Sequence, residues 1–205
     1  MAVDIDGVNS TISTDKLIPQ SGTALQIGES SDVITIPSGA TITNSGTATG
    51  FGGGKILQVL QTTKTDTTTS STTSYVDISG MSVSITPASG TKVLVIVGVN
   101  ISQANTSNQF TWQVVRDSTA IGIGDAASSR TRASSGGNNS ISDESNFQGL
   151  TWLDTHGADG STAVTYKLQW KVAGGTAQLN MYDADTDISS MARMVSTITV
   201  MEIGA

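Results

Sequence analysis

Three carboxylates at alternate positions, Asp183, Asp185 and Asp187, form a cluster of potential metal ligands. In calcium-binding loops, carboxylates spaced in this way converge on one ion. The pattern does not continue as an EF-hand loop requires, because Ile188 stands where the loop needs glycine and Met194 where it needs glutamate. We therefore favour a solvated acidic turn between two strands, and we expect no bound metal or cofactor.

The sequence contains a single histidine, His156, which lies between Asp154 and Asp159. An imidazole near carboxylates could join a metal site or serve as the base of a Ser–His–Asp arrangement. However, the sequence has no cysteine and no second histidine to complete a zinc site, and no Gly-x-Ser-x-Gly motif surrounds any serine. These observations favour a surface turn at His156 and a protein that is not an enzyme.

The composition limits the classes of protein to which the chain can belong. The formal net charge is −7, and only 13% of the residues are charged, about half the usual share. The basic residues are dispersed, which disfavours a nucleic-acid groove. No stretch approaches the ~20 apolar residues of a membrane span, so we expect neither nucleic-acid binding nor membrane insertion.

The N-terminal residues 1–6 lack the basic start and the apolar core of a signal peptide. We therefore expect synthesis in a cytoplasm without an export signal. A surface made of Thr, Ser, Asn and Gln is nevertheless typical of extracellular or virion β proteins. The combination favours a virion component.

Strand signals dominate the chain from residue 55 onward, and helix signals are nearly absent. Residues 91–102 form the most apolar run and are predicted to be a central strand, whereas residues 62–74 are predicted to be a loop or a solvated edge. Gly174-Gly175 predicts a hairpin that pairs residues 177–182 with the preceding strand. The expected fold is an all-β, jelly-roll-like antiparallel β-sandwich, with an immunoglobulin-like sandwich as the alternative. The other predicted strands are 55–61, 75–78, 81–86, 109–117, 120–123, 147–155, 163–172 and 194–203.

The three tryptophans, Trp112, Trp152 and Trp170, each lie within an alternating strand, and we expect them in the sandwich core. Residues 124–146 show no periodicity and are predicted to be a long exposed loop. Such loops carry recognition in many proteins. The candidate interaction residues in this loop are Arg130, Arg132, Asn138 and Asn139.

Residues 1–49 are predicted to be an N-terminal attachment arm of short β-prone units separated by turn signals such as Pro37-Ser38-Gly39. Units this short cannot form a stable isolated sheet, so their apolar side chains need a partner surface. A flexible tail is the alternative. The candidate arm contacts are Val33, Ile34, Ile36 and Ile42.

A glycine-rich stretch separates this arm from the β-sandwich domain of residues 55–205. Glycine reaches backbone dihedrals that are closed to other residues. We therefore predict a hinge at Gly50, Phe51, Gly52, Gly53 and Gly54.

Residues 33–54 read VITIPSGATITNSGTATGFGGG, and residues 55–102 read KILQVLQTTKTDTTTSSTTSYVDISGMSVSITPASGTKVLVIVGVNIS. The first stretch resembles the rungs and hinge that precede the head in structural proteins of tailed bacteriophages. The second resembles the start of the β-sandwich domain of those proteins. The resemblance implies a homotrimer with a jelly-roll head on a narrow stem or arm, and it assigns no functional residue.

Two functions are compatible with this organisation. The first is a capsid decoration or cement protein, whose arm binds the major capsid protein and whose head is displayed outward. The alternative is a receptor-binding tail fibre or tail-tip protein, whose arm binds tail proteins while the 124–146 loop contacts a host surface glycan. A depolymerase would need carboxylates that converge in a groove, and only Asp183–Asp187 and the pair Asp154 and Asp159 could provide them.

Overall fold

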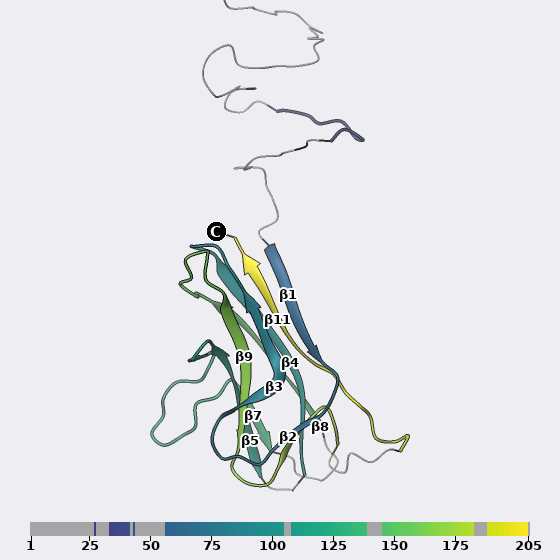
Figure 1. Cartoon of the computed structure of the whole chain (residues 1–205), viewed down its shortest axis with the longest axis vertical. Helices are drawn as coiled ribbons and strands as arrows, with labels where there is room; N and C mark the ends of the chain where they lie inside the picture. The colour runs from purple at the N-terminus through teal and green to yellow at the C-terminus, as the bar shows by residue number, and fades with distance from the viewer. Residues whose placement is uncertain are drawn as a thin grey trace, which may run out of the picture. The chain divides into compact units, whose positions relative to one another are not determined.

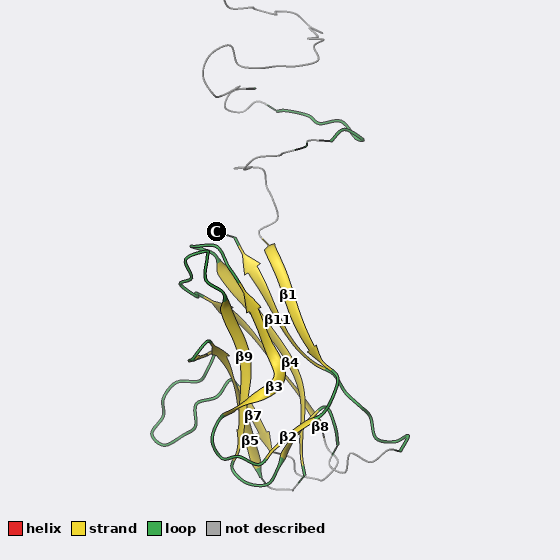
Figure 2. Cartoon of the chain, viewed as in Figure 1, coloured by secondary structure: helices red, strands yellow, loops and turns green. Residues whose placement is uncertain are grey.

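The computed structural model describes residues 27, 33–41, 43, 56–104, 108–138, 145–182 and 188–204. Contacts within the chain divide it into two units, Met1–Phe51 and Gly52–Ala205. The described residues form strands and loops, with no helix among them (Figure 2). It follows that no described segment is a helix of the length and apolarity needed to cross a bilayer.

The described part of the first unit is an extended segment with one tight turn. The backbone N–H of Ala40 donates to the carbonyl oxygen of Pro37 at 3.1 Å, and Gly39 has a φ of 86°. A positive φ at the third residue is what a type II turn requires, and glycine supplies it without strain. The turn predicted from Pro37-Ser38-Gly39 is thus confirmed. Residues 33–36, which precede it, are not paired into a strand.

In the second unit, one sheet is built around β4 (Lys92–Gln103) and is called the β4 sheet (Figure 1). It contains six strands, and its pairings are antiparallel. Along one side β4 pairs with β8 (Ser145–Asp154), and along the other it pairs with β11 (Ser196–Ile203) and then β10 (Ala177–Leu179). β1 (Ile56–Lys64) flanks β11, and β2 (Thr68–Ser70) flanks β10. The predicted central position of residues 91–102 is confirmed.

The other sheet is built around β9 (Val164–Val172) and is called the β9 sheet. It contains five strands. β9 lies between β3 (Val76–Ile85) and β5 (Gln109–Arg116). β5 also pairs with two short strands, β6 (Thr119–Ile121) and β7 (Ser135–Asn138), and all of these pairings are antiparallel.

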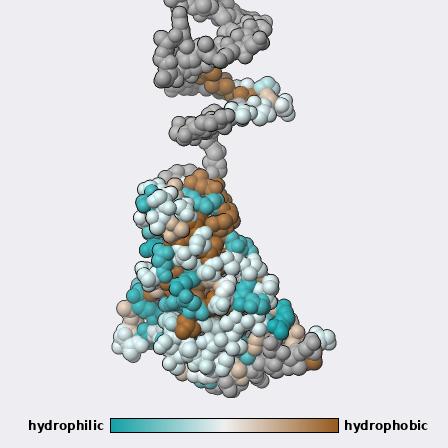
Figure 3. All heavy atoms as spheres, in the orientation of Figure 1, coloured by the Kyte–Doolittle hydropathy of each residue, from teal (hydrophilic) through white to brown (hydrophobic). Residues whose placement is uncertain are grey.

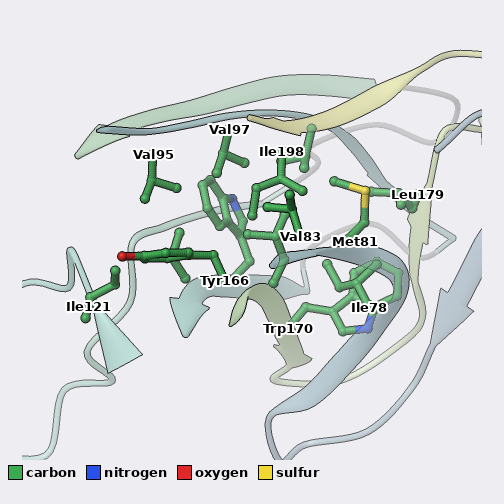
Figure 4. Packing of buried hydrophobic residues seen from close by; sticks show 14 of the residues in the cluster. Ile78, Met81, Val83, Val95, Val97, Ile121, Tyr166, Trp170, Leu179 and Ile198 are labelled. Atoms are coloured by element: carbon green, nitrogen blue, oxygen red, sulfur yellow. The ribbon is translucent and has the colours of Figure 1, made fainter. Parts of the chain in front are cut away.

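The core lies between the two sheets. Figure 4 shows Val95 and Ile198 from the β4 sheet on the side that faces Tyr166 and Trp170 from the β9 sheet. All four side chains are at most 1% exposed. Because successive residues of a strand point to opposite faces, every second residue of β4 and β9 enters this core. The structure confirms an all-β fold of two antiparallel sheets.

The strand β9 shows how closely the sequence pattern predicted burial. Its even-numbered residues, from Val164 to Val172, are buried, and its odd-numbered residues are half-buried. This is the alternation predicted for residues 163–172. The tract 62–74 likewise contains β2 at the edge of the β4 sheet, in agreement with the solvated-edge alternative.

The predicted hairpin at Gly174-Gly175 is wrong. The chain does not return to β9 after these glycines but crosses to the β4 sheet, where Ala177 pairs with Gln103 on one side and Ser70 on the other. All three residues of β10 are buried. A hairpin signal reports only the local backbone, whereas pairing with β4 and β2, which are distant in sequence, places this strand in the other sheet.

The structure also differs from three smaller predictions. Residues 75–78 and 81–86 belong to one strand, β3, whose ladder is irregular between Asp77 and Ser82, where Gly80 adopts a φ of 77°. The predicted loop 124–146 contains β7 and the first residues of β8. Trp152 is not a core residue, because it is 42% exposed on the edge strand β8, while Trp112 and Trp170 are buried as expected.

Candidate functional site

A polar hollow lies on the outer face of the β9 sheet, the face turned away from the core. Its volume is about 490 Å³. We call it the cationic groove, because two of its described lining residues are basic and none of them is acidic. Its polar lining consists of Thr73, Gln109, Thr111, Arg130, Thr131 and Lys171.

Strand pairing places the central residues of this groove. Lys171 of β9 pairs directly with Thr111 of β5, and Thr111 pairs in turn with Gly136 of β7. Residues paired across antiparallel strands point to the same face. Lys171 and Thr111 therefore share the outer face because Trp170 and Phe110, their neighbours in sequence, point into the core.

Tyr75 holds Lys171 in place. The ammonium nitrogen Nζ of Lys171 lies over the Tyr75 ring, 5.1 Å from its centroid, which is within cation–π range. The Tyr75 hydroxyl donates to the carbonyl oxygen of Arg132 at 3.0 Å and lies 3.2 Å from the hydroxyl of Thr111. Burial raises the pKa of Tyr75, so this hydroxyl stays protonated at neutral pH. The hydroxyl end of the ring is thus held by Arg132 and Thr111 while its face contacts Lys171.

The predicted recognition residues separate into different roles. Arg130 lines the cationic groove, and its backbone N–H bonds to Ala127 within the loop. Arg132 instead uses its side chain to hold that loop, since Nε donates to the carbonyl oxygen of Gly124 at 2.7 Å. Asn138 lines a second hollow of about 250 Å³, which also includes Gln109 and Thr111. Asn139 lies outside the described residues.

The second candidate site from the sequence was His156 with Asp154 and Asp159. The structure gives each of these two carboxylates its own separate hydrogen-bond partners. Asp154 is 5% exposed and accepts hydrogen bonds from Arg116 Nη1, at 3.0 and 2.9 Å, and from the Tyr166 hydroxyl, at 2.7 Å. Burial raises the pKa of Tyr166, and the hydrogen bond to Asp154 raises it further. These contacts tie β8 of the β4 sheet to β5 and β9 of the other sheet, so they occupy Asp154 structurally.

His156 and Asp159 also make local contacts. The Nδ1 atom of His156 accepts the backbone N–H of Ala158 at 2.8 Å. Asp159 accepts the backbone N–H groups of Ser161 and Thr162, which lower its pKa to about 2. Within the described ranges, no group of three or more His, Asp and Glu side chains is arranged to hold a metal ion. Asp183, Asp185 and Asp187 lie outside those ranges, so the acidic cluster stays a prediction.

A second surface feature lies on the outer face of the β4 sheet. Val59, Met201, Leu94 and Leu153 pair across four adjacent strands and form one row, which we call the apolar row. Val59 is 50% exposed and Leu153 is 48% exposed, although both are large apolar residues. Figure 3 shows apolar atoms gathered on the surface near the start of β1, where Ile56 and Leu57 extend the exposed apolar area. Exposed apolar patches of this kind often mark interaction sites.

The described arm residues expose their apolar side chains. Val33 is 86% exposed, Ile34 58% and Ile36 46%. Ile42 and the hinge residues Gly50 to Gly54 lie outside the described residues. The roles of the arm and hinge therefore remain predictions.

Sequence reasoning missed Thr73, Tyr75, Thr111 and Lys171 as groove residues. Lys167 and Lys171 occupy equivalent outer positions of β9, and the sequence does not distinguish them. Only the pairing of β9 with β3 and β5 decides which of them faces a carboxylate. Among the groove residues, the sequence pointed only to Arg130, through its position in the long predicted loop.

A scan against models of protein families found no match, and a search of curated proteins also found none.

Proposed function

We propose that the Gly52–Ala205 unit is a jelly roll. The strand order supports this topology: β1-β11-β4-β8 can be followed across one sheet and β3-β9-β5-β6 across the other. Along the chain, these strands cross repeatedly between the sheets, and the first and last of them, β1 and β11, lie side by side. Jelly rolls of eight strands recur in viral capsid and lectin domains.

The proposed function is that of a non-enzymatic virion structural protein of a tailed bacteriophage, a capsid decoration protein that binds the major capsid shell through its arm. The observation that supports it most is the exposure of Val33, Ile34 and Ile36 on an extended segment. An extended segment can add to the exposed sheet edge of a partner, and its alternate side chains then fill pockets on that partner. The head is displayed outward in this arrangement.

The head forms a homotrimer in this proposal. The apolar row supports self-association, because contact with other copies of the chain would remove the exposed surfaces of Val59 and Leu153 from water. The number of three copies comes from the resemblance to the bacteriophage proteins. Burying apolar surface contributes about 25 cal/mol per Å². Association also multiplies the weak contacts of single arms by avidity.

A second candidate, a receptor-binding fibre or tail-tip protein, is favoured by one feature, the cationic groove. In that case the arm binds tail proteins and the outer face of the β9 sheet contacts a host surface glycan. Fold alone does not decide between the two roles, since one architecture serves many functions.

Arm variants test the primary proposal. The triple variant Val33→Asp, Ile34→Asp, Ile36→Asp should lose binding to capsids that lack the protein, because three charges cannot be buried without partners. Co-sedimentation with purified capsids measures the loss. The control is Thr35→Asp, which alters one polar residue in the same segment and should bind within about threefold of the unmodified chain.

Two outcomes would overturn the capsid proposal. One is unchanged capsid binding by the triple variant. The other is binding of the purified chain to host cells with a block of phage adsorption, which would support the fibre alternative instead.

A further inference from the structure

We propose that the cationic groove binds an acidic saccharide, with the carboxylate, sulfate or phosphate group of the sugar held between Arg130 and Lys171. This inference goes beyond capsid attachment and supplies a ligand class for the head. It is argued from the groove alone, so its failure would leave the proposed role of the arm untouched.

Two lysines on the same strand differ in the partners that their side chains contact. Lys167 and Lys171 both lie on the outer face of β9. Lys167 has a carboxylate partner, since its Nζ lies 2.8 Å from Oδ2 of Asp77. Gln169, between them, also binds Asp77 at 2.7 Å. Lys171 receives an aromatic ring in place of an acid, because it extends over Tyr75.

The groove carries positive charge on a chain that is acidic as a whole. The chain has a net charge of −7, yet the groove brings Arg130 and Lys171 together with no acidic residue in its lining. The ion pairs of the described residues involve Lys64, Arg116 and Lys167, and neither groove cation takes part in them. Two like charges at one concave site repel each other, and an anion bound between them adds an attraction to each. A bound anionic group would offset this repulsion.

The other polar residues that line the groove carry uncharged hydrogen-bonding groups. Thr73, Thr111 and Thr131 offer hydroxyl groups, and Gln109 offers an amide. Such groups donate to and accept from the hydroxyls of a sugar ring. The volume of about 490 Å³ falls in the range of about 300–1,000 Å³ found for small-molecule sites. It therefore suits one or two sugar rings better than a free inorganic anion.

A nucleic acid is a poorer fit to the same groove. Binding along a phosphate backbone requires several cations in succession, whereas this groove has two. The net negative charge of the chain also repels a long polyanion at a distance. A short acidic saccharide needs only the local pair of cations.

Calorimetry on the full chain tests the proposal with defined probes. The acidic probes are digalacturonate, a sulfated disaccharide and glucose 6-phosphate, which distinguish the three anionic groups. Maltose is the neutral match, and inorganic phosphate and a short single-stranded oligonucleotide are the non-sugar anions. At least one acidic saccharide should bind at one site per chain, more tightly than maltose, phosphate or the oligonucleotide.

The variants identify the site. Lys171→Gln and Arg130→Gln should each weaken binding of the acidic saccharide about tenfold, as expected for loss of one charge-assisted hydrogen bond. Lys171→Arg keeps the positive charge and should retain most of the affinity. Lys167→Gln is the matched control on the same strand and should change affinity less than about twofold. Thermal melts of each variant confirm that the chain is folded.

Several outcomes would overturn the inference. Absence of binding by all three acidic saccharides would reject it. Equal binding of phosphate would reduce the groove to a general anion site, and tighter binding of the oligonucleotide would assign it to another ligand class. Equal loss of affinity in Lys167→Gln would show that the net charge of the face, and not this groove, determines binding.

Discussion

At the scale of single residues, buried polar side chains connect the first and last strands of the domain, β1 and β11, to neighbouring strands and turns. Asn180 is one of them. Its amide donates to the carbonyl oxygens of Lys64 and Asp66 at 2.9 and 3.1 Å and accepts from the Ser196 hydroxyl at 2.7 Å. Its φ of 61° is one that asparagine tolerates better than most residues. Asn180 thereby connects the turn after β1 to the start of β11.

Glu202 makes a similar set of contacts near the other end of β11. It is 3% exposed, and its carboxylate accepts hydrogen bonds from Gln58 Nε2 at 2.6 Å, Ala88 N at 2.8 Å and Thr91 Oγ1 at 2.9 Å. Burial raises the pKa of Glu202, but these donors outweigh burial and hold the pKa below its ordinary value. The ionised carboxylate is therefore part of the folded structure.

The pH dependence of stability should report this carboxylate. Because the pKa of Glu202 is lower in the folded chain than in the unfolded chain, the unfolded chain takes up the proton first as pH falls. The stabilisation is present above the unfolded pKa of about 4.3 and is lost as pH falls through the folded value. Urea unfolding at pH 7, 4 and 3 should show a smaller loss for Glu202→Gln than for the unmodified chain.

The comparison has an internal control. Asp77 and Asp159 also have lowered pKa values and remain in both proteins, so only the difference between the two curves reports Glu202. Parallel curves for the two proteins would contradict the assigned role. An equal stability at pH 7 would contradict it as well, because the glutamine cannot replace the three charge-assisted contacts.

At the scale of elements, β7 is held by close backbone approach and not by its own strand propensity. Its residues are Ser, Gly, Gly and Asn, which are poor strand formers. A Cβ atom at Gly136 would lie 2.7 Å from the carbonyl oxygen of Phe110. Glycine at this position lets β7 pair with β5 and form the rim of the second hollow.

Gly136→Ala should separate β7 from β5. The added methyl group meets backbone that cannot move without disturbing β5, so we expect a loss of about 1–3 kcal/mol in the free energy of unfolding. Hydrogen exchange should show faster exchange over residues 135–138. Gly124→Ala is the matched control, because a Cβ at Gly124 meets nothing within 4 Å. Unchanged protection of β7 in Gly136→Ala would show that the strand accommodates the methyl group.

At the scale of the whole molecule, the two outer faces of the Gly52–Ala205 unit differ in character. The outer face of the β4 sheet carries the apolar row, while the outer face of the β9 sheet carries the cationic groove. A face that is apolar favours contact with another protein surface, and a polar concave face favours a small hydrophilic ligand. In our proposal, self-association therefore belongs to the outer face of one sheet and ligand binding to the outer face of the other.

Oligomeric state tests this division. Val59→Asp and Leu153→Asp should each convert the proposed homotrimer to monomers, because a charge in the apolar row would be buried without a partner. Light scattering coupled to gel filtration measures the mass. Ser118→Asp, in an exposed turn of the other sheet, is the control and should leave the mass unchanged. A monomeric unmodified chain, or trimers of both variants, would contradict the assignment of this face.

The sequence by itself determined most of the strands, because alternating burial is a local property of the chain. The alternation of β9 and the apolar run of β4 predicted both their positions and the residues that enter the core. The turn at Pro37-Ser38-Gly39 was predictable for the same reason, since a positive φ at Gly39 depends on the residue itself. Of the candidate site, the sequence identified only Arg130.

The tertiary structure alone decided which sheet each strand joins. The Gly174-Gly175 signal could not show that β10 crosses to the β4 sheet, because the competing partners Ala177–Gln103 and Ala177–Ser70 are distant in sequence. The exposure of Trp152 followed from the edge position of β8, and the formation of β7 from the close approach of Gly136 to β5. The same long-range pairing gave Lys167 an acid and Lys171 a tyrosine. Local pattern therefore fixes which way a side chain points along its strand, and only the packing of distant segments fixes what it meets there.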